Sequence, residues 1–214
     1  MFAVTEKTNS MIKNFLEKQI LIVTILGYFF LILTFSGSVI PAYGADKSAI
    51  PSYGHGTHEV LIFTDYFCPP CQDLEKELDL LLEALLTGDS VKVTFVDMPI
   101  YKSTTMYARY FLYAANGSSG YKDIIRARKT LFTLAQQNTA TTEEHLKEAL
   151  KAQGIVLKPY DVKPVFSEYN NIIRKYKVTS TPTCIVKYSE SDLRRYRGLD
   201  EIRSGLSELQ TILK

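Results

Sequence analysis

The sequence predicts an α/β fold, in which a strand–helix–strand unit opens the folded domain and two strands and a helix close it. Residues 59–64 form a short apolar and β-branched run that is typical of a buried parallel strand. In residues 72–86, leucines recur at three- and four-residue spacing, as in an amphipathic helix. Residues 90–97 alternate between apolar and polar side chains as a second strand. Because a helical crossover of this length joins parallel strands, we expect these two strands to be parallel.

The middle and the end of the sequence complete this pattern. Four helical segments are expected between residues 104 and 176, separated by breaks rich in Gly, Ser, Asn and Gln. A strand opened by Pro182 follows, since proline is tolerated at the first residue of a strand. A short strand over residues 192–196 and a helix over residues 199–213 come last. The predicted order is therefore β-α-β, a helical insertion, and β-β-α.

The N-terminal residues differ in character from the rest. Three lysines precede an uncharged apolar run over residues 20–40, which is long enough to span a bilayer as a helix with its N-terminal side in the cytoplasm. Residues 42–44, Ala-Tyr-Gly, have small side chains at the two positions that a signal peptidase reads. We expect residues 1–45 to be a signal peptide or an N-terminal membrane anchor, with either Met1 or Met11 as the start. The rest of the protein is then expected outside the cytoplasm.

The remaining residues divide into a linker and a domain of near-neutral charge. Residues 46–57 are rich in Gly, Ser and Pro and are predicted to be a linker, which leaves residues 58–214 as the folded domain. In the whole chain, 25 Lys and Arg nearly balance 23 Asp and Glu. The net charge therefore gives no reason to expect a nucleic-acid partner.

A Cys-x-x-Cys pair lies where the first strand runs into its helix, in the order Cys68-Pro69-Pro70-Cys71. Cys68 is expected at the N-terminus of the helix, where amide donors and the helix dipole stabilise an anion, and the thiolate is the nucleophile of disulfide exchange. Cys71, one turn further along and more buried, would then attack the Cys68 sulfur and resolve the mixed disulfide. The sequence therefore predicts a redox-active dithiol.

Two other roles for this cysteine pair are less favoured. A structural disulfide that closes four residues would remove little chain entropy. Zinc binding would need two further ligands, which His55 and His58 could supply. Zinc motifs of this kind usually place the cysteines first and separate the two pairs by more residues. We therefore assign no metal ligands.

The early Cys-x-x-Cys together with the late Thr181-Pro182 resembles the thioredoxin fold, and the helices between the second and third core strands resemble its Dsb-type, DsbA-like branch of thiol-disulfide oxidoreductases. This resemblance covers residues 58–213. It implies a central mixed sheet flanked by helices, with a helical insertion over about residues 100–176. It also implies protein or peptide thiols and disulfides as substrates, with no external cofactor. In the family, a cis-proline packs against the dithiol and frees backbone groups to pair with an extended substrate peptide, a role that Thr181 and Pro182 would take here.

The two prolines between the cysteines bear on the redox potential. Pro69 and Pro70 have no N–H group, so two amides that could point at the Cys68 thiolate are missing, and the amide of Cys71 is expected to supply most of what remains. Strongly oxidising members of the family carry a histidine where Pro70 stands. A less stabilised thiolate disfavours the reduced form. We therefore expect a reduction potential below that of the strongest oxidants.

Three further positions near the site are notable. Ile62 stands where many thioredoxins have a buried carboxylate, and Asp65, the nearest acid, is expected too near the surface to pass a proton to Cys71. Cys184 lies two residues beyond Pro182 and should point to the same face of its strand. We interpret Cys184 as a buried core residue, with a third redox thiol as the alternative.

These observations predict an exported thiol-disulfide oxidoreductase that exchanges electrons with a partner thiol protein, for which a membrane protein is one candidate. Both directions of electron flow stay open, as oxidant or as reductant. Two other classes of function stay open as well. One is a redox-inactive binding or chaperone module on the same fold, and the other is a metal-delivery protein that uses the cysteine pair.

Overall fold

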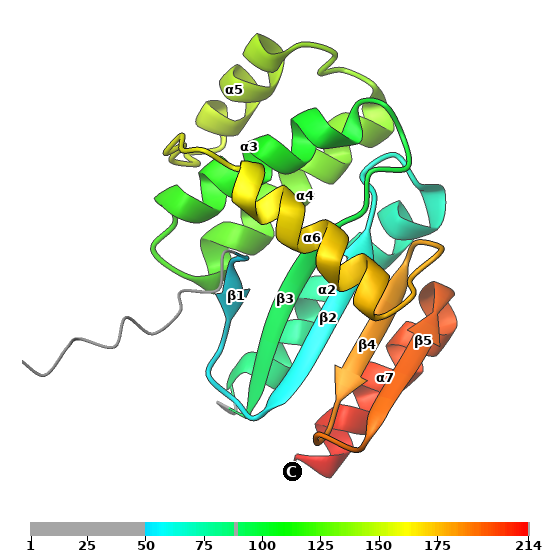
Figure 1. Cartoon of the computed structure of the whole chain (residues 1–214). Coiled ribbons are helices and arrows are strands. Elements are labelled where there is room, and N and C mark those ends of the chain that lie inside the picture. Colours follow the sequence, from blue (N-terminus) through cyan, green and yellow to red (C-terminus); the bar gives the residue numbers. More distant parts are fainter. Residues whose placement is uncertain (1–49, 88–89, 214) are drawn as a thin grey trace, which may run out of the picture. The chain divides into compact units, whose positions relative to one another are not determined.

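A five-stranded mixed sheet lies at the centre of the computed structural model, which describes residues 50–87 and 90–213 (Figure 1). The strands follow the order β1-β3-β2-β4-β5, and only the β2–β3 pair is parallel in this sheet. The predicted parallel pairing is confirmed. The strands are β1 (Ser52–Tyr53), β2 (His58–Thr64), β3 (Val91–Asp97), β4 (Thr183–Lys187) and β5 (Leu193–Arg197).

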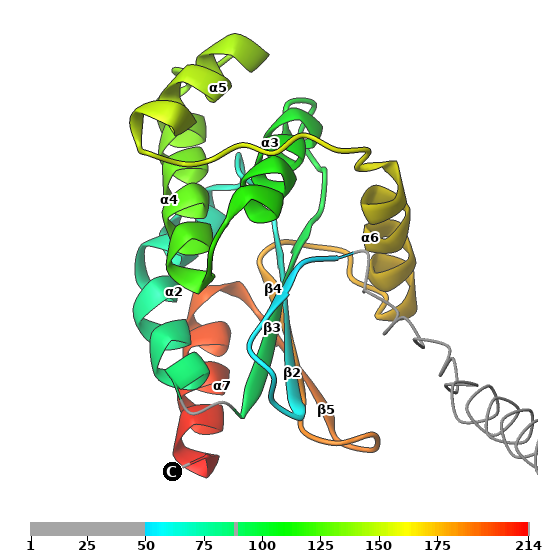
Figure 2. The ribbon, with the colours of Figure 1, turned by 90° about the vertical axis from the view of Figure 1, so that its left-hand side faces the viewer.

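Helices cover both faces of the sheet. Figure 2 shows α2, α4 and α7 on one side of the strands and α6 on the other. Helices α3 to α6 lie between β3 and β4, which is where the sequence predicts the helical insertion. The helices are α2 (Pro69–Thr87), α3 (Thr104–Gly117), α4 (Tyr121–Gln137), α5 (Glu143–Ala152), α6 (Lys163–Lys175) and α7 (Gly198–Ile212).

The register of the three central strands brings distant parts of the sequence to one edge of the sheet. At the end of β2, Phe63 lies beside Thr183, the first residue of β4, and Thr64 lies beside Asp97, the last residue of β3. All four side chains are buried. The turn that follows β2, the loop that precedes β4 and the loop that follows β3 therefore meet at this edge.

The prediction of a linker over residues 46–57 is wrong for residues 50–53. Ile50 is buried, and Ser52 and Tyr53 form β1, which pairs antiparallel with β3. The Ser52 Oγ lies 2.7 Å from Thr94 Oγ1, and the Tyr53 ring packs on Phe95 with 6.1 Å between centroids. These contacts add residues 50–53 to the sheet, although the composition of the segment is typical of a linker.

The predicted membrane span over residues 20–40 and the predicted cleavage site at residues 42–44 lie outside the described residues. Among the helices of residues 50–87 and 90–213, none has the length and apolar character needed to cross a membrane.

Candidate active site

The turn between β2 and α2 carries the cysteine pair. Helix α2 begins at Pro69, directly after Cys68, so Cys68 lies at the helix N-terminus as predicted. Its side chain is 8% exposed, whereas Cys71 is completely buried one turn into the helix. Pro69 and Pro70 are exposed, and all three cysteines carry free thiols. Cys68 is therefore the more accessible sulfur, with Cys71 behind it.

The amide of Cys71 has a different partner from the one expected. It donates to the carbonyl oxygen of Cys68 at 3.0 Å, and the amide of Gln72 donates to the same oxygen at 3.1 Å. The first turn of the helix closes onto the carbonyl of the residue that precedes it, so this amide is engaged with backbone. The Cys68 sulfur donates instead to the carbonyl of Thr181 at 3.4 Å. Because Pro69 and Pro70 have no N–H group, few backbone amides remain that could donate a hydrogen bond to a Cys68 thiolate and stabilise it.

The loop before β4 contacts both cysteines. The peptide bond between Thr181 and Pro182 is cis, as the family resemblance implies. The Thr181 hydroxyl is buried, and it has no hydrogen-bond partner within residues 50–87 and 90–213. Burial raises the pKa of the Cys71 thiol, and the neighbouring Thr181 side chain and Asp65 backbone lower it only in part. Cys71 is therefore held as a neutral thiol beneath Cys68.

Asp65 is buried, so the prediction that it lies near the surface is wrong. Its carboxylate is surrounded by hydrogen-bond donors, which offset the cost of burying a charge. These donors occupy both oxygens of the Asp65 carboxylate. The donors are Phe67 N (2.8 Å), Ile100 N (2.8 Å), Tyr101 N (3.2 Å) and Thr104 Oγ1 (2.7 Å).

Cys184 lies in the core. It pairs in register with Ile62 on β2, and both side chains are fully buried. Burial raises the pKa of the Cys184 thiol to about 12. At neutral pH this thiol is protonated and enclosed, as expected of a small core residue.

A buried charge cluster beneath the active-site turn was not predicted. Arg128 of α4 is completely buried and donates to both carboxylate oxygens of Glu75 at 2.9–3.3 Å. It also donates to Thr64 at 3.1 Å, and its Nη1 lies 3.9 Å from Asp97 Oδ1. The hydroxyl of Tyr66 donates to the other oxygen of Asp97 at 3.0 Å. The cluster therefore joins α2 and α4 to the ends of β2 and β3.

One sequence signal could have revealed this cluster. Glu75 lies four residues after Cys71, on the face of α2 that otherwise carries only buried apolar side chains. Arg128 likewise interrupts the buried face of α4. A single acid and a single base on two otherwise apolar helix faces indicate a buried pair, since unpaired charges are almost never fully buried.

The charge state of Asp97 depends on this cluster. Burial raises its pKa to about 6, and Arg128 and the Tyr66 hydroxyl lower it only in part. The charges of Asp65 and Glu75 act in the same direction as burial. A folded-state pKa above the ordinary value of 3.8 means that the fold binds the proton more tightly than the unfolded chain does. The resulting stabilisation is complete below pH 3.8 and is lost as the pH rises through about 6.

We expect Asp97→Asn to remove this pH dependence. From this pKa shift, the free energy of unfolding of the wild-type chain should fall by on the order of 2 to 3 kcal/mol between pH 4 and pH 7, relative to that of the variant. Urea unfolding of both proteins across this range measures the difference. A constant difference in unfolding free energy would show that Asp97 does not titrate there.

The zinc interpretation is not supported by the geometry. His55 and His58 lie at or before the start of β2, whereas Cys68 and Cys71 follow its other end. The His58 ring instead lies 3.3 Å from the carbonyl of Ser90. Within residues 50–87 and 90–213, no group of three or more His, Cys, Asp or Glu side chains is arranged to hold a metal ion.

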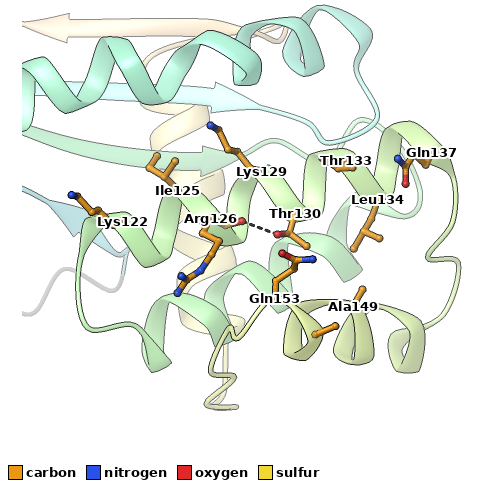
Figure 3. Close-up of a pocket in the computed structure, with 11 residues that line it drawn as sticks. Lys122, Ile125, Arg126, Lys129, Thr130, Thr133, Leu134, Gln137, Ala149 and Gln153 are labelled. Carbon is orange, nitrogen blue, oxygen red and sulfur yellow. Dashed lines mark hydrogen bonds between the residues drawn. The ribbon is translucent and has the colours of Figure 1, made fainter.

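One groove lies away from the cysteines. It has a volume of about 740 Å³ between α4 and α5, and Figure 3 shows Lys122, Arg126 and Lys129 among its lining residues. Arg126 is paired with Asp123 and Lys129 with Asp79. None of the predicted site residues lines this groove.

The mixed sheet, the helical insertion between β3 and β4, the dithiol at the start of α2 and the proline loop before β4 together define a thioredoxin fold of the kind found in Dsb-type proteins. A family model described as Thioredoxin matches residues 54–202, and the chain belongs to this family. A search of the curated proteins finds no match.

Solved structures share this fold. ScsC of Proteus mirabilis is 18% identical, with 78% of this chain and 74% of that chain covered and a TM-score of 0.59. A periplasmic thioredoxin-like protein from Salmonella enterica serovar Typhimurium is 22% identical, with 78% and 93% covered and a TM-score of 0.57. DsbA2 of Pseudomonas aeruginosa is 16% identical, with 74% and 92% covered and a TM-score of 0.52. At these identities the likeness establishes the fold.

Proposed function

We propose that this protein catalyses thiol-disulfide exchange with protein substrates through Cys68 and Cys71. The observation that carries this proposal is the grouping of three features within one small site. These are a cysteine at a helix N-terminus that is 8% exposed, a completely buried thiol one turn behind it, and the carbonyl of Thr181 at 3.4 Å from the first sulfur.

The reaction needs only these two sulfurs and the substrate. In the reducing direction, the Cys68 thiolate attacks one sulfur of a substrate disulfide, the substrate S–S bond breaks, and a mixed disulfide forms as one substrate thiolate leaves. Cys71 then loses its proton and attacks the Cys68 sulfur, which releases the second substrate thiolate. The protein ends as the Cys68–Cys71 disulfide, two electrons have passed to the substrate, and the two substrate thiolates take up protons. The oxidising direction is the reverse.

The loop before β4 would hold the substrate chain. Pro182 has no N–H group to donate, so we expect an extended peptide beside Cys68 to pair with the backbone of Thr181. The Thr181 side chain near Cys71 would assist the resolving step, because it lowers the pKa of a thiol that burial otherwise raises.

The partners and location follow from the same chemistry. Electrons would pass to or from another thiol protein, with a membrane protein as one candidate, and no external cofactor is needed. Persistent exchange of disulfides suits an oxidising compartment, so we place the protein outside the cytoplasm. Residues 1–45 would serve as its signal peptide or membrane anchor.

The test is the reduction potential of the dithiol, measured in the full chain by equilibration with glutathione and then dithiothreitol. We expect reversible formation of the Cys68–Cys71 disulfide, at a potential below about −120 mV because few amides face the Cys68 sulfur. A value near about −270 mV or lower would indicate a reductant. A value near about −120 mV would contradict the donor count, and a pair that never forms a disulfide would refute the proposed function.

A further inference from the structure

Asp65 joins two loops at the active-site edge of the sheet. Its Oδ1 accepts a hydrogen bond from the amide of Phe67, the residue before Cys68, while its Oδ2 accepts two from the loop between β3 and α3 and one from Thr104, the first residue of α3. Its carbonyl accepts the Cys68 amide at 3.2 Å. One buried residue thus fixes the turn that carries the nucleophile and the neighbouring loop of residues 98–103.

Two exposed apolar side chains project from that neighbouring loop. Ile100 is 52% exposed and Tyr101 is 46% exposed, although both of their amides are bound to Asp65. The half-buried ring of Phe67 lies 6.3 Å from that of Tyr101 and 4.9 Å from that of Tyr107. We call Phe67, Ile100 and Tyr101 the apolar shoulder. The other large exposed apolar side chains of the described residues are each separated from one another in the sequence.

We propose that Asp65 is a positioning residue that holds the apolar shoulder in place to contact the substrate chain on one side of the reacting sulfur. This inference rests on the proposed function and deepens it. The favoured substrate segment is an extended chain that carries apolar side chains next to its cysteine. The shoulder is continuous with the reaction site, because Phe67 is bonded to Cys68, whose sulfur lies 3.4 Å from the carbonyl oxygen of Thr181.

The energetic reason for such an arrangement is preorganisation. Residues 98–103 form a loop between β3 and α3, and without Asp65 the amide of Tyr101 would lose this partner, while the amide of Ile100 would keep only the carbonyl of Met98 at 2.9 Å. A loop that is ordered before binding loses less conformational entropy when a substrate chain settles on it. The Asp65 carboxylate is fully buried, so bulk water does not compete directly for its hydrogen bonds with the loop.

The closing experiment uses Asp65→Asn in the full chain. The carboxamide can offer one oxygen only, so either Phe67 or the neighbouring loop must face an NH₂ group in place of an acceptor. With a disulfide peptide that has Leu and Phe beside its cysteine, we expect KM to rise about tenfold, equivalent to about 1.4 kcal/mol, while kcat changes much less. The amides of Ile100 and Tyr101 should also exchange their hydrogens faster.

The matched control is Asp73→Asn, the same substitution at an exposed carboxylate on α2 that pairs with Lys76. We expect its KM and exchange rates to equal those of the wild-type protein. An Asp65→Asn variant with unchanged KM and unchanged amide exchange would overturn the inference.

A second variant keeps the inference testable if Asp65→Asn fails to fold. Ile100→Ser combined with Tyr101→Ser changes only exposed side chains. It should raise KM about tenfold for the Leu- and Phe-flanked peptide and leave KM unchanged for a peptide flanked by Gly and Ser. Equal effects on both peptides, or no effect on either, would overturn the inference. If instead the wild-type protein exchanges neither peptide, the proposed function itself fails.

Discussion

Replacement of Cys68 by serine is expected to reduce thiol-disulfide exchange to the uncatalysed rate. A serine hydroxyl is not ionised at neutral pH and cannot form the mixed disulfide, so the first step has no nucleophile. Reduction of insulin by dithiothreitol and reoxidation of a reduced model protein measure the two directions of the reaction. The same assays on Cys71→Ser should show a trapped mixed disulfide between Cys68 and the substrate, because no thiol remains to resolve it.

Cys184→Ala is the matched control for these two variants. Its thiol is fully buried on β4, so we expect turnover close to that of the wild-type protein once any loss of stability is allowed for. If Cys68→Ser still binds client proteins as well as the wild-type protein does, the result would indicate a chaperone module. Stoichiometric copper or zinc binding that is lost in Cys71→Ser would point to metal delivery. Either result, without exchange activity in the wild-type protein, would contradict the proposed function.

Arg128→Met is expected to destabilise the fold by about 3 to 5 kcal/mol. The substitution keeps much of the side-chain volume but removes the cation that lies against Glu75 and near Asp97, and an uncompensated buried carboxylate is costly. The guanidinium also lies 4.0 Å from the centroid of the Phe95 ring, so a favourable cation–π contact is lost. Urea unfolding at pH 7 measures the change in free energy.

Two comparisons isolate the role of the Arg128 charge. Lys129→Met, at the next position of α4, removes a half-exposed cation that pairs with Asp79, and it should cost less than about 1 kcal/mol. Adding Glu75→Gln and Asp97→Asn to Arg128→Met removes the stranded charges, so we expect part of the stability to return. An Arg128→Met variant as stable as the wild-type protein would show that the cluster does not hold α4 against the sheet.

The sequence predicts much of the fold and the centre of the site, because these depend on local patterns. The alternation of residues 90–97 and the leucine spacing of residues 72–86 identify β3 and α2 within a few residues of their ends. The three-residue spacing puts Cys71 one helical turn after Cys68, and the helix period therefore predicts that Cys71 is the more deeply buried of the two.

The features that sequence reasoning misses depend on partners that are distant along the chain. Aspartate is a residue type that is usually exposed. The burial of Asp65 depends on hydrogen-bond donors that lie 35 to 39 residues further along the chain. Arg128 is buried because Glu75 and Thr64 meet it from 53 and 64 positions away. The two residues of β1 are too few to show alternation, so only their pairing with β3 makes them a strand.

The two edge strands of the sheet limit the tendency of this protein to aggregate with its proposed substrates. A protein that handles extended chains risks pairing with them along its own free sheet edges, which is the first step of aggregation. Here one edge is β1, only two residues long, and the other is β5, which carries Arg194, Arg195 and Arg197. A short edge offers few backbone groups, and long charged side chains along the other edge disfavour the approach of a further strand. Both edges therefore discourage growth of the sheet into neighbouring chains.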